Sequence, residues 1–156
     1  MKKWILIIST IILILDQFIK YIVTSFISFQ ESIHIIPNFL YLTNVKNTGG
    51  AWSIFNNNQF FLIVISMICI IGLIIYIYKK NNFTKIETIY YGLIIGGIIG
   101  NFIDRIIRSG VIDYIGTIFG NYYFPVFNLA DICIVCGAGL LLIDSFRGEQ
   151  NGNRSN

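Results

Sequence analysis

Four apolar stretches, each about twenty residues long, lie at about residues 4–26, 59–78, 86–107 and 125–146. A helix of about 20 apolar residues matches the hydrocarbon core of a lipid bilayer. Charged residues make up only 12% of the chain, which is about half of their usual share in a soluble domain. The sequence therefore predicts one integral-membrane domain over residues 1–156, with four transmembrane helices.

The first stretch follows Lys2 and Lys3, and a basic start before an apolar run is also typical of a secretory signal peptide. This run is longer than the apolar region of a signal peptide, and no small-x-small cleavage site follows it, so we expect a retained helix. Asp16 and Lys20 are four residues apart and lie on one face of that helix. We expect an internal ion pair that locks the helix into the bundle. Support of a nearby site is the alternative, and Lys20 could also extend to the outer interface.

Residues 27–58 and 108–124 interrupt the helical pattern. In the first segment, β-branched and aromatic residues at 32–36 and 39–43 predict short strands. We interpret this segment as a small sheet that lies on the membrane surface. The second segment is amphipathic and rich in glycine and tyrosine, and we expect it to be irregular.

Basic residues are distributed unequally between the two sides of the membrane. Four spans put both termini and the 79–85 loop on one side, whose basic residues are Lys2, Lys3, Lys79, Lys80, Lys85, Arg147 and Arg154. The basic residues of the other side are Lys46, Arg105, Arg108 and, near a helix end, Lys20. The positive-inside rule makes the richer side cytoplasmic. The expected fold class is therefore an all-α membrane protein with four transmembrane helices and a small extracytoplasmic β-rich loop subdomain.

Small residues inside the apolar runs suggest where the helices pack closely against one another. Gly92 and Gly96 continue to Gly100 at four-residue spacing, which predicts a close approach between helices. The three cysteines are odd in number and lie within apolar runs, which argues against a disulfide framework; they are Cys69, Cys133 and Cys136. We interpret them as small buried apolar residues.

Few groups in the sequence suit enzymatic catalysis. His34 is the only histidine, and there is no HExxH motif or metal-ligand cluster. A serine–lysine dyad that uses Lys20 or Lys46 stays open, without specific support. Neither a glycine-rich phosphate loop nor a basic patch interleaved with aromatic residues occurs, so we expect no metal, no other cofactor and no nucleic-acid partner.

Three carboxylates lie near the outward ends of the third and fourth spans: Asp104, Asp113 and Asp131. An ionisable residue in such a setting is a functional candidate. Asp104 precedes Arg105, and we expect this pair to be structural. Asp113 and Asp131 have no adjacent base, and two such groups close together cannot both ionise easily. One of the two carboxyl groups would keep a proton, as aspartic proteolysis requires. The alternative is that Asp113 and Asp131 are two unrelated polar anchors at helix ends.

Five motifs occur in order along the chain. They are Asp16-Gln17-x-x-Lys20, Asn47-Thr48-Gly49-Gly50-Ala51-Trp52-Ser53, Gly100-Asn101-Phe102-Ile103-Asp104-Arg105, Val111-Ile112-Asp113-Tyr114 and Phe124-Pro125-Val126-Phe127-Asn128-Leu129-Ala130-Asp131. As an ordered set they resemble the motifs of the bacterial lipoprotein signal peptidase family, also called signal peptidase II. Gly50 and Trp52 stand where the family more often has Ala and Phe.

The resemblance implies an aspartic endopeptidase that removes the signal peptide from diacylglyceryl-modified prolipoproteins, before the lipidated cysteine. It implies that Asp113 and Asp131 are the catalytic pair, near the extracytoplasmic face of the bacterial cell membrane. The residues that it implies as substrate-binding or site-supporting are Asn47, Gly49, Asn101, Arg105 and Asn128. We keep Asp16, Lys20 and Asp104 as structural polar residues. The expected partners are the lipidated precursor and membrane lipid, and we expect a monomer.

The outer loop carries apolar residues that could rest in the membrane interface and cover the substrate: Phe39, Tyr41 and Trp52. Two other functions stay open. A small transporter or assembly factor would use the buried carboxylates as an ion or proton path. A thiol enzyme would depend on Cys133 or Cys136.

Overall fold

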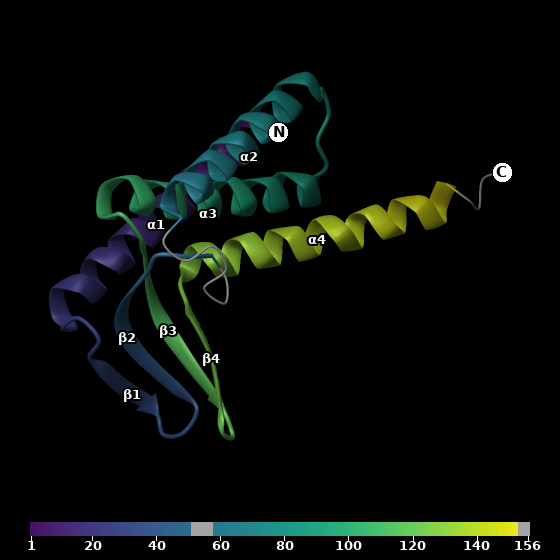
Figure 1. Ribbon diagram of the computed structural model, residues 1–156. Helices are drawn as coiled ribbons and strands as arrows, with labels where there is room; N and C mark the ends of the chain where they lie inside the picture. The colour runs from purple at the N-terminus through teal and green to yellow at the C-terminus, as the bar shows by residue number, and fades with distance from the viewer. Residues whose placement is uncertain (51–57, 153–156) are drawn as a thin grey trace.

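The computed structural model describes residues 1–50 and 58–152, so Trp52 and the end of its motif lie outside the described residues. The described residues form four helices and four strands, in the order α1, β1, β2, α2, α3, β3, β4, α4 (Figure 1). The helices are α1 (Lys2–Phe26), α2 (Gln59–Lys79), α3 (Lys85–Arg108) and α4 (Leu129–Gly152). The strands are β1 (Ser32–Ile36), β2 (Leu40–Asn47), β3 (Val111–Phe119) and β4 (Tyr122–Phe127).

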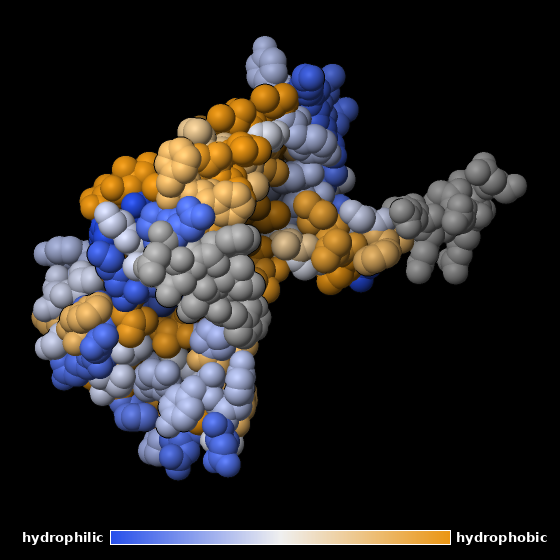
Figure 2. Space-filling view, viewed as in Figure 1, coloured by the Kyte–Doolittle hydropathy of each residue, from blue (hydrophilic) through white to orange (hydrophobic). Residues whose placement is uncertain are grey.

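All four described helices are long and apolar enough to cross a membrane, which in α4 holds for Leu129–Arg147. The first three start and end within two residues of the expected spans. Large apolar side chains remain exposed along them, and Figure 2 shows hydrophobic residues gathered over the helices. Such a surface is suited to contact with lipid.

The helix α3 lies at the centre of the bundle and packs against α1, α2 and α4. A Cβ on Gly92 would lie 2.6 Å from Ile8 Cγ2, and one on Gly96 would lie 2.8 Å from the carbonyl oxygen of Ser9. Only glycine permits this approach of α1 to α3. The predicted role of both glycines in helix packing is confirmed.

The sheet is larger than expected. Its antiparallel order is β1-β2-β3-β4, so two strands come from each of the interrupting segments. The predicted strands at 32–36 and 39–43 are confirmed as β1 and as the first half of β2. The irregular structure expected for residues 108–124 is wrong, because this segment pairs with β2 and then turns back on itself. The protein is therefore mostly helical with a four-stranded sheet, rather than all-α.

The start of the fourth span also differs from the expectation. Residues 125–127 belong to β4, and the helix begins only at Leu129. Pro125 lacks a backbone N–H, which an edge strand tolerates. β4 is such an edge strand, because it pairs with β3 alone. This arrangement pairs the end of β4 with the middle of β3, at Ile115, and brings the start of α4 close to Asp113, where the candidate site lies.

Candidate active site

A cavity of about 970 Å³ lies between the sheet and the helices. Its walls are supplied by β2, β3, β4, α3 and α4. Both Asp113, from β3, and Asp131, from α4, line it. The remaining wall is mostly apolar and includes Phe124, Ile132 and Val135. The fold thus brings the two predicted aspartates to one cavity.

Asp131 is held by the local structure at the start of α4. Asn128 immediately precedes this helix, and its Oδ1 accepts a hydrogen bond from the Asp131 backbone N–H at 3.0 Å. In return, the Asn128 backbone N–H donates to Asp131 Oδ2 at 3.2 Å. This reciprocal pair is a capping box, with aspartate in the place where glutamate is usual. The other oxygen, Oδ1, accepts from Asn101 Nδ2 at 2.7 Å.

Asp113 is 2% exposed and lies near the start of β3, on the wall of the cavity. Its Oδ1 accepts from Asn128 Nδ2 at 2.6 Å, and its Oδ2 accepts from Asn47 Nδ2 at 2.9 Å. Burial, followed by the negative charge of Asp131, raises the pKa of Asp113 to about 7. Asn128 therefore contacts both aspartates, and the electrostatic coupling between the carboxyl groups favours one shared proton.

Asn47 and Gly49 come from the end of β2 and the residues after it. The Gly49 backbone N–H donates to Asn47 Oδ1 at 2.9 Å. This bond turns the amide nitrogen of Asn47 toward Asp113. Gly49 therefore orients Asn47, and Asn47 orients the Asp113 carboxyl group.

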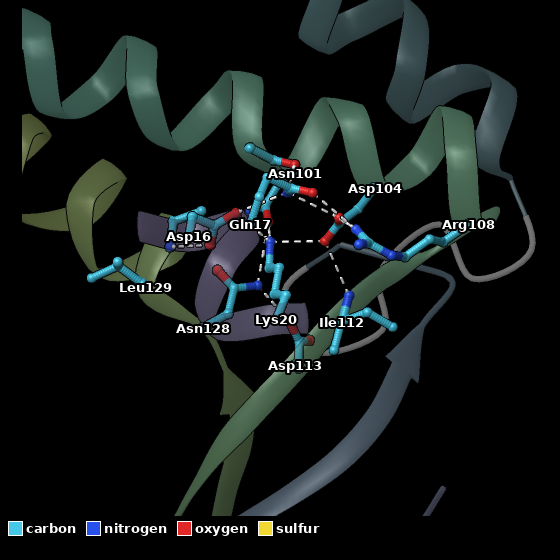
Figure 3. Close-up of polar contacts among 12 residues, drawn as sticks. Asp16, Gln17, Lys20, Asn101, Asp104, Arg108, Ile112, Asp113, Asn128 and Leu129 are labelled. Atoms are coloured by element: carbon cyan, nitrogen blue, oxygen red, sulfur yellow. Dashed lines mark hydrogen bonds and ion pairs between the residues drawn. The ribbon is translucent and has the colours of Figure 1, made fainter. Parts of the chain in front are cut away.

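A second polar cluster lies behind the cavity, where α1 meets α3 (Figure 3). Lys20 Nζ lies 2.8 Å from Asp16 Oδ2 and 2.8 Å from Asp104 Oδ2, and all three side chains are fully buried. The expected Asp16–Lys20 ion pair is confirmed. The alternative position of Lys20 at the outer interface is wrong, because its ammonium group is enclosed in the bundle.

The expected pairing of Asp104 with Arg105 is also wrong. Asp104 pairs with Lys20 and with Arg108, one helical turn later. Residues four apart share a helix face, whereas consecutive residues point in directions about 100° apart. The spacing of Asp104 and Arg108 was the signal in the sequence that would have identified the pair. Gln17 joins the cluster by accepting from Arg108 Nη1 at 3.0 Å, although the sequence suggested no role for it.

Arg105 instead points to the cavity, which it lines. Its Nη1 donates to the Asn101 carbonyl oxygen at 3.4 Å. Its buried Nε has no hydrogen-bond partner among the described residues. A buried donor without an acceptor is destabilising, so this guanidinium is a group that can bind an oxygen of a molecule in the cavity.

The structure also bears on the metal, thiol and lysine chemistry considered from the sequence. Within the described residues, no group of three His, Cys, Asp or Glu side chains could hold a metal ion. All three cysteines are free, and only Cys133 is buried, so the expectation of burial is wrong for Cys69 and Cys136. Lys20 donates to Asp16, Asp104 and Asn101. These three contacts use all three hydrogens of its ammonium group.

Comparison with known proteins yields one family. Residues 8–147 match the family model described as Signal peptidase (SPase) II. A lipoprotein signal peptidase of Listeria monocytogenes is 43% identical over 140 residues, which cover 89% of this chain and 90% of the relative. A lipoprotein signal peptidase of Anoxybacillus flavithermus is 36% identical over 140 residues, which cover 90% of this chain and 83% of the relative.

Two solved bacterial membrane enzymes share the fold. One has a TM-score of 0.87 and 32% identity, with 94% of this chain and 90% of the other covered. The second has a TM-score of 0.80 and 33% identity, with 90% of each chain covered. The four apolar helices, the sheet and these matches agree, and the chain belongs to the signal peptidase II family of membrane proteases.

Proposed function

We propose that this protein cleaves the signal peptide from diacylglyceryl-modified prolipoproteins, immediately before the lipidated cysteine. The observation that carries the proposal is that two carboxyl groups, those of the buried Asp113 and the partly buried Asp131, lie on the wall of one largely apolar cavity. Relatives that match nearly the whole chain are lipoprotein signal peptidases. A lipid-bound peptide is a suitable occupant of a cavity whose wall combines apolar side chains with a few polar groups.

Asp113 and Asp131 have different hydrogen-bonding environments, which suggests different roles. Asp131 accepts from Asn101 and from the Asn128 backbone N–H, which stabilises an ionised carboxylate. Burial and the negative charge of Asp131 raise the pKa of Asp113 to about 7, and we assign the shared proton to Asp113. Asp131 is therefore the general base and Asp113 the general acid.

The reaction then needs only water. Asp131 removes a proton from a water molecule, and the water oxygen bonds to the scissile carbonyl carbon. Protonated Asp113 donates a hydrogen bond to the carbonyl oxygen. The C–N bond of the tetrahedral intermediate then breaks, and the leaving amine takes a proton from the dyad. The products are a carboxylic acid on the signal peptide and a free amine on the lipidated cysteine.

Arg105 and Asn47 are the groups that we assign to substrate binding. The Nε of Arg105, which has no partner among the residues described, offers a hydrogen bond to a substrate carbonyl oxygen. Asn47 lines the same cavity and also contacts Asp113. The apolar wall, which includes Ile132 and Val135, would contact the signal peptide or the acyl chains within the membrane.

The membrane placement is also part of the proposal. The distribution of basic residues supports a cytoplasmic location of both termini. The sheet and the two aspartates would then lie at the outer face of the bacterial cell membrane, with exposed apolar residues such as Phe39 in the interface. We propose that a monomer suffices, because one chain supplies both carboxyl groups.

The direct test uses the purified protein in lipid nanodiscs with a synthetic precursor, with and without its diacylglyceryl group. We expect cleavage of the lipidated form only, and mass spectrometry should place the new amine on the modified cysteine. A variant in which all three cysteines are serine should retain the activity. Ion or proton flux through proteoliposomes without any cleavage would contradict the proposal and support the transporter alternative.

The pKa of Asp113 predicts a pH dependence of cleavage. The mechanism needs protonated Asp113, so kcat/KM should fall about tenfold per pH unit above about pH 7. The hydrogen bond from Asn47 lowers this pKa. Asn47→Ala should therefore shift the alkaline limb of the pH profile of kcat/KM to higher pH, whether or not the maximal rate also falls.

Asn44 provides the control for this shift, because it is an asparagine of the same strand that donates to the Ile27 carbonyl oxygen instead. Asn44→Ala should leave the position of the alkaline limb unchanged. An unchanged or lower limb in Asn47→Ala would contradict the assignment of that limb to Asp113.

A further inference from the structure

Lys20 makes more contacts than an ion pair between two helices needs. Its Nζ lies 2.8 Å from Asp16 Oδ2, 2.8 Å from Asp104 Oδ2 and 3.0 Å from Asn101 Oδ1. An ammonium group has three hydrogens, and each has one acceptor here. The side chain is fully buried, so no water competes for these contacts.

Each carboxylate bound to Lys20 also holds the backbone beside one aspartate of the dyad. Asp16 Oδ1 accepts from the Ala130 N–H at 3.2 Å, and Ala130 immediately precedes Asp131. Asp104 Oδ2 accepts from the Ile112 N–H at 3.3 Å, and Ile112 immediately precedes Asp113. Lys20 therefore connects two chains of polar contacts (Figure 3). One runs through Asp16 to the start of α4, and the other runs through Asp104 to β3.

The third contact determines how Asn101 is oriented. Lys20 can only donate, so the oxygen of the Asn101 amide must face it. The amide nitrogen then points the other way, where it donates to Asp131 at 2.7 Å. Asn128 Nδ2 also donates to the same Asn101 oxygen, at 3.3 Å, and this contact links Asn101 to the residue that touches Asp113. Without the ammonium group, only the longer contact from Asn128 Nδ2 would hold the Asn101 amide in this orientation.

We infer that Lys20 is a positioning residue for catalysis, whose ammonium group sets the separation and orientation of Asp113 and Asp131 through Asp16, Asp104 and Asn101. This inference rests on the proposed function of that pair. It goes beyond a structural ion pair, because two contacts of Lys20 lead to the backbone of the residues that precede Asp113 and Asp131, and the third leads through Asn101 to the Asp131 carboxyl group.

The chemistry of the site explains why lysine suits it. The donor must be compact, must reach from α1 to α3, and must bond three acceptors in different directions. An ammonium group does so, whereas a guanidinium is planar and larger. Lys20→Arg should therefore fail to replace lysine in this fully buried position.

The test separates turnover from folding. A lipidated peptide with a reduced, uncleavable scissile bond counts the binding-competent sites, and kcat is expressed per site. For Lys20→Met, we expect kcat per site to fall about 100-fold, the loss typical of a catalytic group displaced by about 1 Å, with KM within threefold of the parent. Lys80→Met is the matched control, because it removes the partner of Glu87 in the connection between α2 and α3. Its kcat per site should stay within about threefold.

A second variant separates positioning from charge balance. Lys20→Met/Asp16→Asn removes one charge of each sign and leaves Asp104 paired with Arg108. We expect its kcat per site to remain about as low as that of Lys20→Met, because Asn101 still lacks the hydrogen bond from Lys20 and keeps only the longer one from Asn128. Recovery to within threefold of the parent would overturn the inference, since charge balance alone would then suffice. A normal kcat per site in Lys20→Met would also overturn it, as would loss of peptide binding in both variants, which would assign Lys20 to folding.

The parent protein separates this inference from the proposed function. If the parent does not cleave the lipidated precursor, the proposed function fails. If the parent cleaves it and Lys20→Met does so equally fast per site, only the role of Lys20 fails.

Discussion

Asp113→Asn and Asp131→Asn are each expected to lower kcat at least about 1,000-fold, because each removes one proton-transfer group from the dyad. An asparagine at either position keeps the size of the side chain but can neither accept a proton from water nor donate one to the leaving amine. The measurement is single-turnover cleavage of the lipidated precursor, with the sites counted by binding of the uncleavable peptide.

Asp144 provides the matched control for these substitutions. It is an aspartate of the same helix as Asp131, and it lies beside Arg147 at a small separate cavity. Asp144→Asn should retain kcat within about threefold. Cleavage by Asp113→Asn or Asp131→Asn at more than about a tenth of the parent rate would remove the dyad from the mechanism. Other chemistry, such as that of Cys136, would then have to be considered.

Gly97→Ala is expected to impair both stability and turnover. A Cβ at this position would lie 2.5 Å from the Ala130 carbonyl oxygen and 2.8 Å from Ile134 Cγ1. The start of α4 would have to move away from α3, and overpacking of this kind typically lowers the free energy of unfolding by about 1–3 kcal/mol. The same movement displaces Asp131, the next residue after Ala130, so we expect kcat to fall about 10- to 100-fold. Denaturant unfolding in detergent and single-turnover cleavage would measure the two effects.

Gly139→Ala is the control, because no described atom beyond its chain neighbours and the nearby backbone of its own helix lies within 4 Å of the added methyl group. Alanine has a higher helix propensity than glycine, so this change should be neutral or stabilising by up to about 1 kcal/mol. Equal behaviour of the two variants would mean that the close contact at Gly97 does not hold α4 in place.

Features that depend on local sequence were predicted well. Length and hydropathy place the first three helices, since a membrane span requires about 20 apolar residues. Helical spacing identified the Asp16–Lys20 pair and the contacts of Gly92 and Gly96, because residues four apart share a face. The same rule, applied to Asp104, would have favoured Arg108 over its neighbour Arg105.

Features that depend on distant pairing were not predicted. The strands β3 and β4 gain their hydrogen bonds from β2 and from each other, so their own residues carry only a weak signal. Phe-Pro-Val-Phe at 124–127 is apolar enough to extend the following helix, but it continues the sheet to Phe127 instead. The capping box between Asn128 and Asp131 is what starts the helix.

The amino-acid sequence by itself determined a four-helix membrane protein and two aspartates in motifs that resemble one family. Only the tertiary structure decided how these aspartates are held, because their partners come from four separate parts of the chain. These are Asn47 in β2, Asn101 in α3, Asn128 between β4 and α4, and Lys20 in α1, which acts through two other carboxylates. Hydropathy and spacing report the environment of a residue along its own element. The orientation of a buried amide or ammonium group depends instead on which acceptors distant elements bring within about 3 Å.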